Sequence, residues 1–140
     1  MSVERLELLY QLERYDQLLE EAIQLRGEDP DGVAAPLYSI VALMAKGELA
    51  EAQAYCSRVR MTCAASSHYW YLTAKVLRHQ KLFRKADEAI DQALKLDCWD
   101  ADYLCEKALI AWGREKVAET KHYFDQALAQ EPVHRVSLLG

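Results

Sequence analysis

Residues 70–93, WYLTAKVLRHQKLFRKADEAIDQA, decide the fold, because small and apolar side chains recur there at helical spacing on both sides of one break. The steps are four, three, nine, four and three residues: Trp70, Ala74, Leu77, Ala86, Ile90 and Ala93. Steps of three and four keep side chains on one face of an α-helix. The stretch therefore predicts two amphipathic helices that pair through these faces.

The same pattern recurs along the chain at a constant interval, the repeat length, of about 34 residues. One interval later it falls on Leu104, Ala108, Ala111, Thr120, Phe124 and Ala127. One interval earlier it falls on Pro36, Ile40, Leu43, Ala52, Cys56 and Val59, and two intervals earlier on Ser2, Leu6, Leu9, Leu18, Ala22 and Leu25. A period that is kept without insertion over four units indicates a repeat array.

Each repeat is expected to hold two helices, and Gly and Pro mark turns between them, as at Gly47 and Pro132. The expected helices cover residues 2–13, 16–27, 34–46, 49–62, 67–80, 83–96, 101–112 and 116–130. They form repeats at about 1–32, 33–66, 67–100 and 101–134, within a single domain over 1–134. Residues 135–140 are expected to begin a capping or further helix that is cut short.

This pattern resembles the tetratricopeptide repeat (TPR) family, whose 34-residue unit carries a Trp, small residues and a final Pro at fixed positions. The third repeat matches best, and the fourth adds Phe124, Ala127 and Pro132. The resemblance implies an all-α fold, a right-handed α-solenoid of four antiparallel helix pairs. It also implies a concave groove that binds segments of other proteins.

The resemblance assigns different surroundings to the three consecutive rings of Tyr69, Trp70 and Tyr71. Trp70 falls at the buried position of the first helix in its repeat and is expected in the core. Tyr71 falls on the groove side, and Tyr69 on the convex or inter-helix side. Rings that face different ways do not form a ligand cage.

The groove positions of the family carry aromatic, apolar and basic residues in this chain. They are Tyr38, Val41, His68, Tyr71, Lys75, Arg78, His79, Leu109 and Trp112. Four of them, from Tyr71 to His79, follow one stripe of a single helix. Cations steer an acidic partner and rings supply contact area, so the expected ligand is an acidic, partly apolar protein segment.

Charge is distributed unevenly along the chain. Residues 1–51 hold eleven acids and four Lys or Arg (−7), residues 52–86 hold seven Lys or Arg and no acid (+7), and residues 87–140 hold eleven acids and six bases (−5). These values add to the net charge of −5. Such a basic belt also suits nucleic acid, but the acidic chain as a whole argues against that partner.

The sequence lacks the signatures of catalysis and metal binding. It contains no glycine-rich phosphate loop, no H-E-x-x-H and no C-x-x-C. We therefore expect no enzyme, no cofactor and no metal site. No run of about 20 apolar residues predicts a membrane span. Four cysteines without a secretory signal favour reduced thiols and a cytoplasmic location.

These observations favour a non-catalytic interaction module or scaffold that binds a partner segment in the groove. The alternative is a secretion or assembly chaperone that holds a client segment in the same groove. A homodimer is a further hypothesis, in which the acidic first repeat of one copy meets the basic belt of another.

Overall fold

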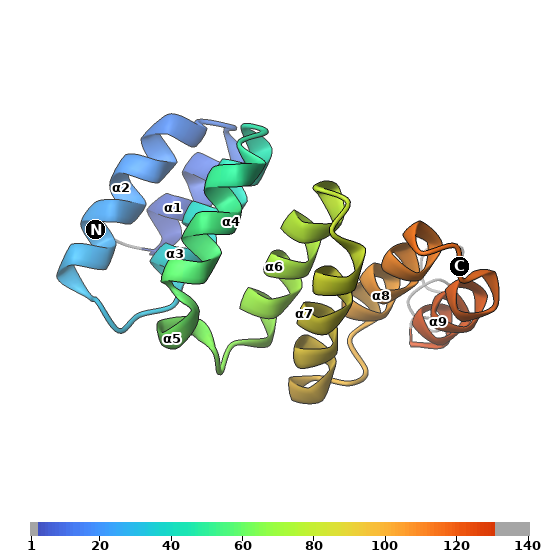
Figure 1. The fold of residues 1–140 in the computed structure, drawn as a ribbon. Coiled ribbons are helices and arrows are strands. Elements are labelled where there is room, and N and C mark those ends of the chain that lie inside the picture. The colour runs from blue at the N-terminus through green and yellow to red at the C-terminus, as the bar shows by residue number, and fades with distance from the viewer. Residues whose placement is uncertain (1–2, 131–140) are drawn as a thin grey trace. The chain divides into compact units, whose positions relative to one another are not determined.

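The computed structural model describes residues 3–130, and over this range it is all-α, as the sequence predicted (Figure 1). The helices are α1 (Val3–Gln11), α2 (Tyr15–Glu28), α3 (Ala34–Ala45), α4 (Leu49–Arg58), α5 (Arg60–Cys63), α6 (Ser67–His79), α7 (Phe83–Leu96), α8 (Ala101–Gly113) and α9 (Val117–Ala129). The helix expected over 49–62 is divided at Val59 into α4 and α5. The expected helix over 135–140 lies outside the described residues.

The chain divides into two compact units, Met1–Leu72 and Thr73–Gly140, and the boundary falls inside α6. In the first unit α1 packs on α2 and α3, α2 packs on α3, and α3 packs on α4. In the second unit α7 packs on α8, and α8 packs on α9. We call α1, α3, α6 and α8 the A helices and α2, α4, α7 and α9 the B helices. Each A helix is followed by a B helix.

The turns from A helix to B helix repeat the period of the sequence in the backbone itself. Among residues 3–130, positive φ occurs at Glu13 (59°), Gly47 (78°), Lys81 (64°) and Glu115 (61°), each one repeat length after the last. At each turn the next N–H donates to the carbonyl five residues back, as from Arg14 to Leu9 and from Lys116 to Ala111. This hydrogen bond is typical of an α-helix that ends at a residue in the left-handed backbone conformation. Four equivalent turns establish the repeat independently of the side chains.

The residues that set the period form the core of the two units. Nearly all of those described are buried, including Leu6, Ala22, Ile40, Ala52, Ala74, Ala86, Ile90, Ala108 and Ala127. The exceptions are Leu25, Trp70 and Phe124. Alanine at many of these positions lets paired helices approach closely, because a methyl group fills little of the space between them.

Trp70 is not the core aromatic of its repeat, which corrects the expectation from sequence. Its neighbour Tyr69 is 1% exposed, and the Tyr69 hydroxyl donates to the Cys56 carbonyl at 2.6 Å. Trp70 is half-buried, its indole N–H donates to the Ala64 carbonyl at 2.8 Å, and Arg60 lies 5.5 Å from its ring. The physical reason is that an indole N–H requires a partner, and Trp70 reaches one near the surface.

Helix α8 is fixed at both ends, which sets the orientation of its exposed face. The Asp100 carboxylate accepts from the N–H groups of Asp102 and Tyr103 at 2.9 and 3.3 Å and caps the first turn. At the last turn Gly113 lies against the ring of Phe83, where a Cβ atom would come within 2.2 Å of a ring carbon. Glycine is therefore needed for α8 to approach α7 this closely.

Candidate partner-binding surface

The predicted groove residues lie on A helices, and each unit holds some of them. The first unit holds Tyr38 and Val41 on α3, with His68 and Tyr71 on α6. The second unit holds Lys75, Arg78 and His79 on α6, with Leu109 and Trp112 on α8. Lys75 and Leu109 are one repeat length apart, as are Arg78 and Trp112. The same two positions are therefore occupied by cationic residues on α6 and by apolar residues on α8.

Arg78 is joined to Glu106, and this ion pair ties α6 to α8 inside the second unit. The Arg78 Nε atom contacts one carboxylate oxygen of Glu106, and Arg78 Nη2 donates to the other at 3.2 Å. Glu106 is only 3% exposed. A buried carboxylate needs a partner, because its desolvation is costly otherwise. Arg78 therefore compensates the buried charge of Glu106.

Tyr38 makes the corresponding contact in the first unit. Tyr38 and Glu106 occupy equivalent positions two repeats apart (106 − 38 = 68, twice 34), and Tyr38 donates its hydroxyl hydrogen to Glu7 on the preceding A helix. Burial and this hydrogen bond to the Glu7 carboxylate raise the pKa of Tyr38 to about 12. In each unit a side chain at this position bonds to the A helix before it.

The remaining predicted residues of α6 show two local contacts. The rings of His68 and Tyr71 lie 5.5 Å apart in the first unit, with His68 exposed and Tyr71 half-buried. His79 is exposed, and its Nδ1 atom lies 2.8 Å from the Lys75 carbonyl oxygen. His79 thus stays close to the end of its own helix, while Tyr71 and Lys75 lie one turn apart on α6.

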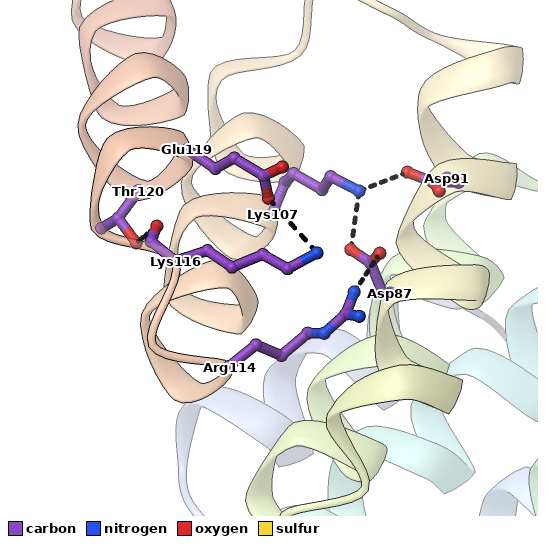
Figure 2. Close-up of polar contacts among 7 residues, drawn as sticks. All are labelled: Asp87, Asp91, Lys107, Arg114, Lys116, Glu119 and Thr120. Carbon is purple, nitrogen blue, oxygen red and sulfur yellow. Dashed lines mark hydrogen bonds and ion pairs between the residues drawn. The ribbon is translucent and has the colours of Figure 1, made fainter.

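The side of α8 that carries Lys107 is held to α7 by an ionic network. Leu109 and Trp112 lie away from this side and face outward. Figure 2 shows Lys107 Nζ between Asp87 and Asp91, at 2.6 and 2.8 Å, with Arg114 on the second oxygen of Asp87 at 3.0 Å. Desolvation lowers the pKa of Lys107, but hydrogen bonds to Asp87 and Asp91 outweigh it, so that the pKa is raised. The cation is therefore retained at neutral pH.

Leu109 and Trp112 are large apolar side chains left in contact with solvent. Leu109 is exposed, and Trp112 is 64% exposed on the last turn of α8. Apolar side chains that remain exposed together indicate an interaction surface, since their burial by a partner is favourable. Together they could hold a protein segment through apolar contacts.

Comparison with protein-family models and with curated proteins gives no match. Solved structures do match. TTC0263 from Thermus thermophilus, described as a thermophilic TPR protein, has a TM-score of 0.80 and 16% identity over 92% of this chain and 72% of that one. MamA from Desulfovibrio magneticus RS-1 has a TM-score of 0.79 and 16% identity over 92% and 73%. YrrB, a TPR protein with an unusual peptide-binding site, has 0.54 and 12% over 97% and 88%.

This chain has the TPR fold. The likeness extends over nearly the whole sequence, and it confirms the fold that the period of the sequence predicted. At 12–16% identity it establishes the architecture and does not carry a binding site from those proteins to this chain.

Two features of the TPR surface were missed from the sequence. They are the carboxylates of Glu7 and Glu106, which accept hydrogen bonds from Tyr38 and Arg78. One signal could have indicated Glu106, because the period places it equivalent to the apolar Leu72 on the A helix before it. A carboxylate at such a position requires a cation nearby.

Two classes of site receive no support from the described residues. None of the helices within residues 3–130 is long and apolar enough to cross a membrane. Over the same range no group of three or more His, Cys, Asp or Glu side chains is placed to hold a metal ion.

Proposed function

We propose that this TPR chain is a non-catalytic interaction module that binds a short segment of a partner protein along α6 and α8. The observation that carries the proposal is the exposure of Leu109 and Trp112 on a helix that Glu106 and Lys107 fix in place. Exposed apolar side chains on a rigid helix lose little conformational entropy when a partner covers them. The description of YrrB as peptide-binding agrees with this use of the fold.

The bound segment carries an apolar side chain that packs on Trp112 and Leu109, and a carboxylate that approaches Lys75. Because Arg78 already pairs with Glu106, the electrostatic attraction is smaller than two exposed cations would give. Apolar contact supplies most of the affinity, and Lys75 affects the association rate and the orientation of the segment. Tyr71, one turn before Lys75 on α6, extends the surface. Tyr38, Val41 and His68 are the proposed contacts of the first unit.

A selection from phage-displayed random peptides tests this function. Peptides are selected on the wild-type chain after depletion on the Lys75→Glu/Trp112→Ala variant, so that those retained require this surface. Circular dichroism first establishes that the variant is folded. The expected result is a family of peptides that combine an aromatic or large aliphatic residue with Asp or Glu.

A matched control is available in the second unit. Trp99 lies in the connection between α7 and α8 and is 66% exposed, almost as much as Trp112. Selected peptides should bind the Trp99→Ala variant as they bind the wild type. The proposal fails if no peptide is enriched after depletion, or if the enriched peptides bind the depleting variant equally well.

A further inference from the structure

Within residues 3–130, two helix faces, one on α1 and one on α9, expose apolar side chains at positions where equivalent faces inside the chain are covered. Leu8 on α1 is 50% exposed, but its equivalents in the later repeats, Ala42, Val76 and Ile110, are all 0% exposed. Phe124 on α9 is 36% exposed, although its equivalents are buried. These equivalents are Ala22, Cys56 and Ile90. Large apolar residues are therefore exposed at positions where this chain elsewhere buries them.

The first unit shows what covers such faces. Ala22 on α2 and Ala42 on α3 belong to one buried core cluster, in which a B helix meets the next A helix. Ala22 is the equivalent of Phe124, and Ala42 is the equivalent of Leu8. In the second unit Ile90 on α7 and Ile110 on α8 are fully buried at the same two positions, so this packing also accepts large side chains.

The exposed face of α9 carries an apolar stripe that Lys121 interrupts. Val117, Phe124 and Leu128 are exposed and follow one another at seven and four residues. Their equivalents on α7 are Phe83, Ile90 and Leu94, which are buried or half-buried. Phe83 contacts the last turn of α8, the next A helix. An A helix is therefore the structure that fits this stripe.

We propose that α9 of one copy binds α1 of a second copy, as α2 binds α3 and α7 binds α8 within the chain. The contact is heterologous, since each copy contributes a different face. Each copy keeps one unused face after pairing, so association continues beyond the dimer unless a ring closes. This proposal is independent of the proposed function, because the two faces do not include Lys75, Leu109 or Trp112.

The proposed contact between α9 and α1 includes both favourable and unfavourable charge pairs. Burial of apolar side chains is therefore the main force for association. Lys107 on α8 bonds Asp87 and Asp91 on α7. The equivalent positions place Arg5 of α1 opposite Lys121 and Asp125 of α9, which gives one favourable and one unfavourable pair. Arg5 is also paired with Glu21 in its own copy. Added salt should therefore change the association little, unlike a dimer in which the basic belt meets an acidic face.

Sedimentation velocity over a wide range of concentrations tests the proposal with three variants. Leu8→Glu blocks the α1 face, and Phe124→Glu blocks the α9 face. Met61→Glu is the control, since Met61 is a strongly exposed apolar residue on neither face and the charge change is the same. Wild type and Met61→Glu should associate alike as concentration rises. Each blocked variant should remain monomeric at concentrations at least about tenfold higher. Circular dichroism checks that all variants are folded.

Mixing the two blocked variants is the decisive step. Leu8→Glu retains its α9 face and Phe124→Glu retains its α1 face, so an equimolar mixture should form a heterodimer that grows no further. A mixture that stays monomeric overturns the proposal. Association of Leu8→Glu alone would overturn it in favour of symmetric pairing through α9. A wild type that is monomeric at every concentration would also overturn it.

Discussion

Arg78 on α6 and Glu106 on α8 form a two-contact ion pair in which the carboxylate is almost completely buried. The pair joins the two A helices that carry Lys75, Leu109 and Trp112, so it supports the candidate surface without extending it. Its role changes what a substitution at Arg78 means. Loss of partner binding in an Arg78 variant could arise from loss of stability, whereas the exposed Trp112 reports on the surface itself.

Replacement of Arg78 by Met should lower the free energy of unfolding by about 3–5 kcal/mol, because Glu106 is left buried without its cation. The double variant Arg78→Met/Glu106→Leu should recover most of this loss, since both charges are removed together. Urea unfolding of the four members of the cycle measures the coupling. Additive effects would contradict the structural importance of the pair. Lys116→Met, in the exposed pair with Glu119, is the control and should cost less than about 1 kcal/mol.

Tyr69 and Trp70 should respond to substitution in the opposite order from the one that the TPR resemblance implies. Tyr69→Ala should cost about 3–5 kcal/mol, because it removes a buried ring. Tyr69→Phe should cost about 1 kcal/mol through the lost hydrogen bond to Cys56. Trp70→Ala should cost about 1 kcal/mol, as a typical substitution at a half-buried site does. Thermal and urea unfolding decide the order, and a larger loss for Trp70→Ala than for Tyr69→Ala would refute it.

The turn residues with positive φ should respond to glycine and alanine in opposite directions. Glu115→Gly should stabilise the chain by about 0.5–1 kcal/mol, because glycine adopts φ near 61° without the strain that other residues carry there. Gly47→Ala should destabilise by about 1 kcal/mol, although a Cβ atom there meets nothing within 4 Å. If urea unfolding shows that both variants raise, or both lower, the free energy of unfolding, backbone strain is not the cause.

Stability should fall in acid partly through the pair of Glu21 and Arg5. The hydrogen bond from Arg5 holds the pKa of Glu21 below its ordinary value, and burial opposes this shift. A carboxylate with a lowered folded pKa stabilises the fold above its unfolded pKa, and this contribution is lost as the pH falls through the folded value. The destabilisation caused by Glu21→Gln should therefore shrink between about pH 7 and about pH 3. A pH-independent difference in urea midpoint would contradict this origin.

The sequence could predict the fold because the residues that recur with its period face the core. Ala74, Ala86 and Ala93 identify the paired helix faces, and the same spacing places Ile40 and Ala108. The recurrent turn was visible only at Gly47, since Glu13, Lys81 and Glu115 are not residues that ordinarily mark a left-handed turn. There the tertiary structure imposes a conformation that local preference does not favour.

The candidate surface could be predicted less completely. Periodicity assigns Lys75, Arg78 and Trp112 to one face of the A helices, but it does not show which cations are already paired. The partner of Arg78 is 28 residues away on another helix. Side-chain length and burial decide such pairs, and a repeat period describes neither. The same limit explains Trp70. Periodicity predicted its helix face, but the hydrogen bond from its indole N–H to Ala64 keeps the side chain half-buried near the surface.

The central claim is that the exposed face of α8 binds a partner segment, and the affinity of one selected peptide for two tryptophan variants tests it most directly. Fluorescence anisotropy gives the Kd of a labelled peptide for the wild type, Trp112→Ala and Trp99→Ala. The two tryptophans are 64% and 66% exposed, so loss of exposed aromatic surface is matched between the variants. We expect Trp112→Ala to weaken binding at least about tenfold and Trp99→Ala to change it less than about twofold. Equal Kd values for the two variants would contradict the claim.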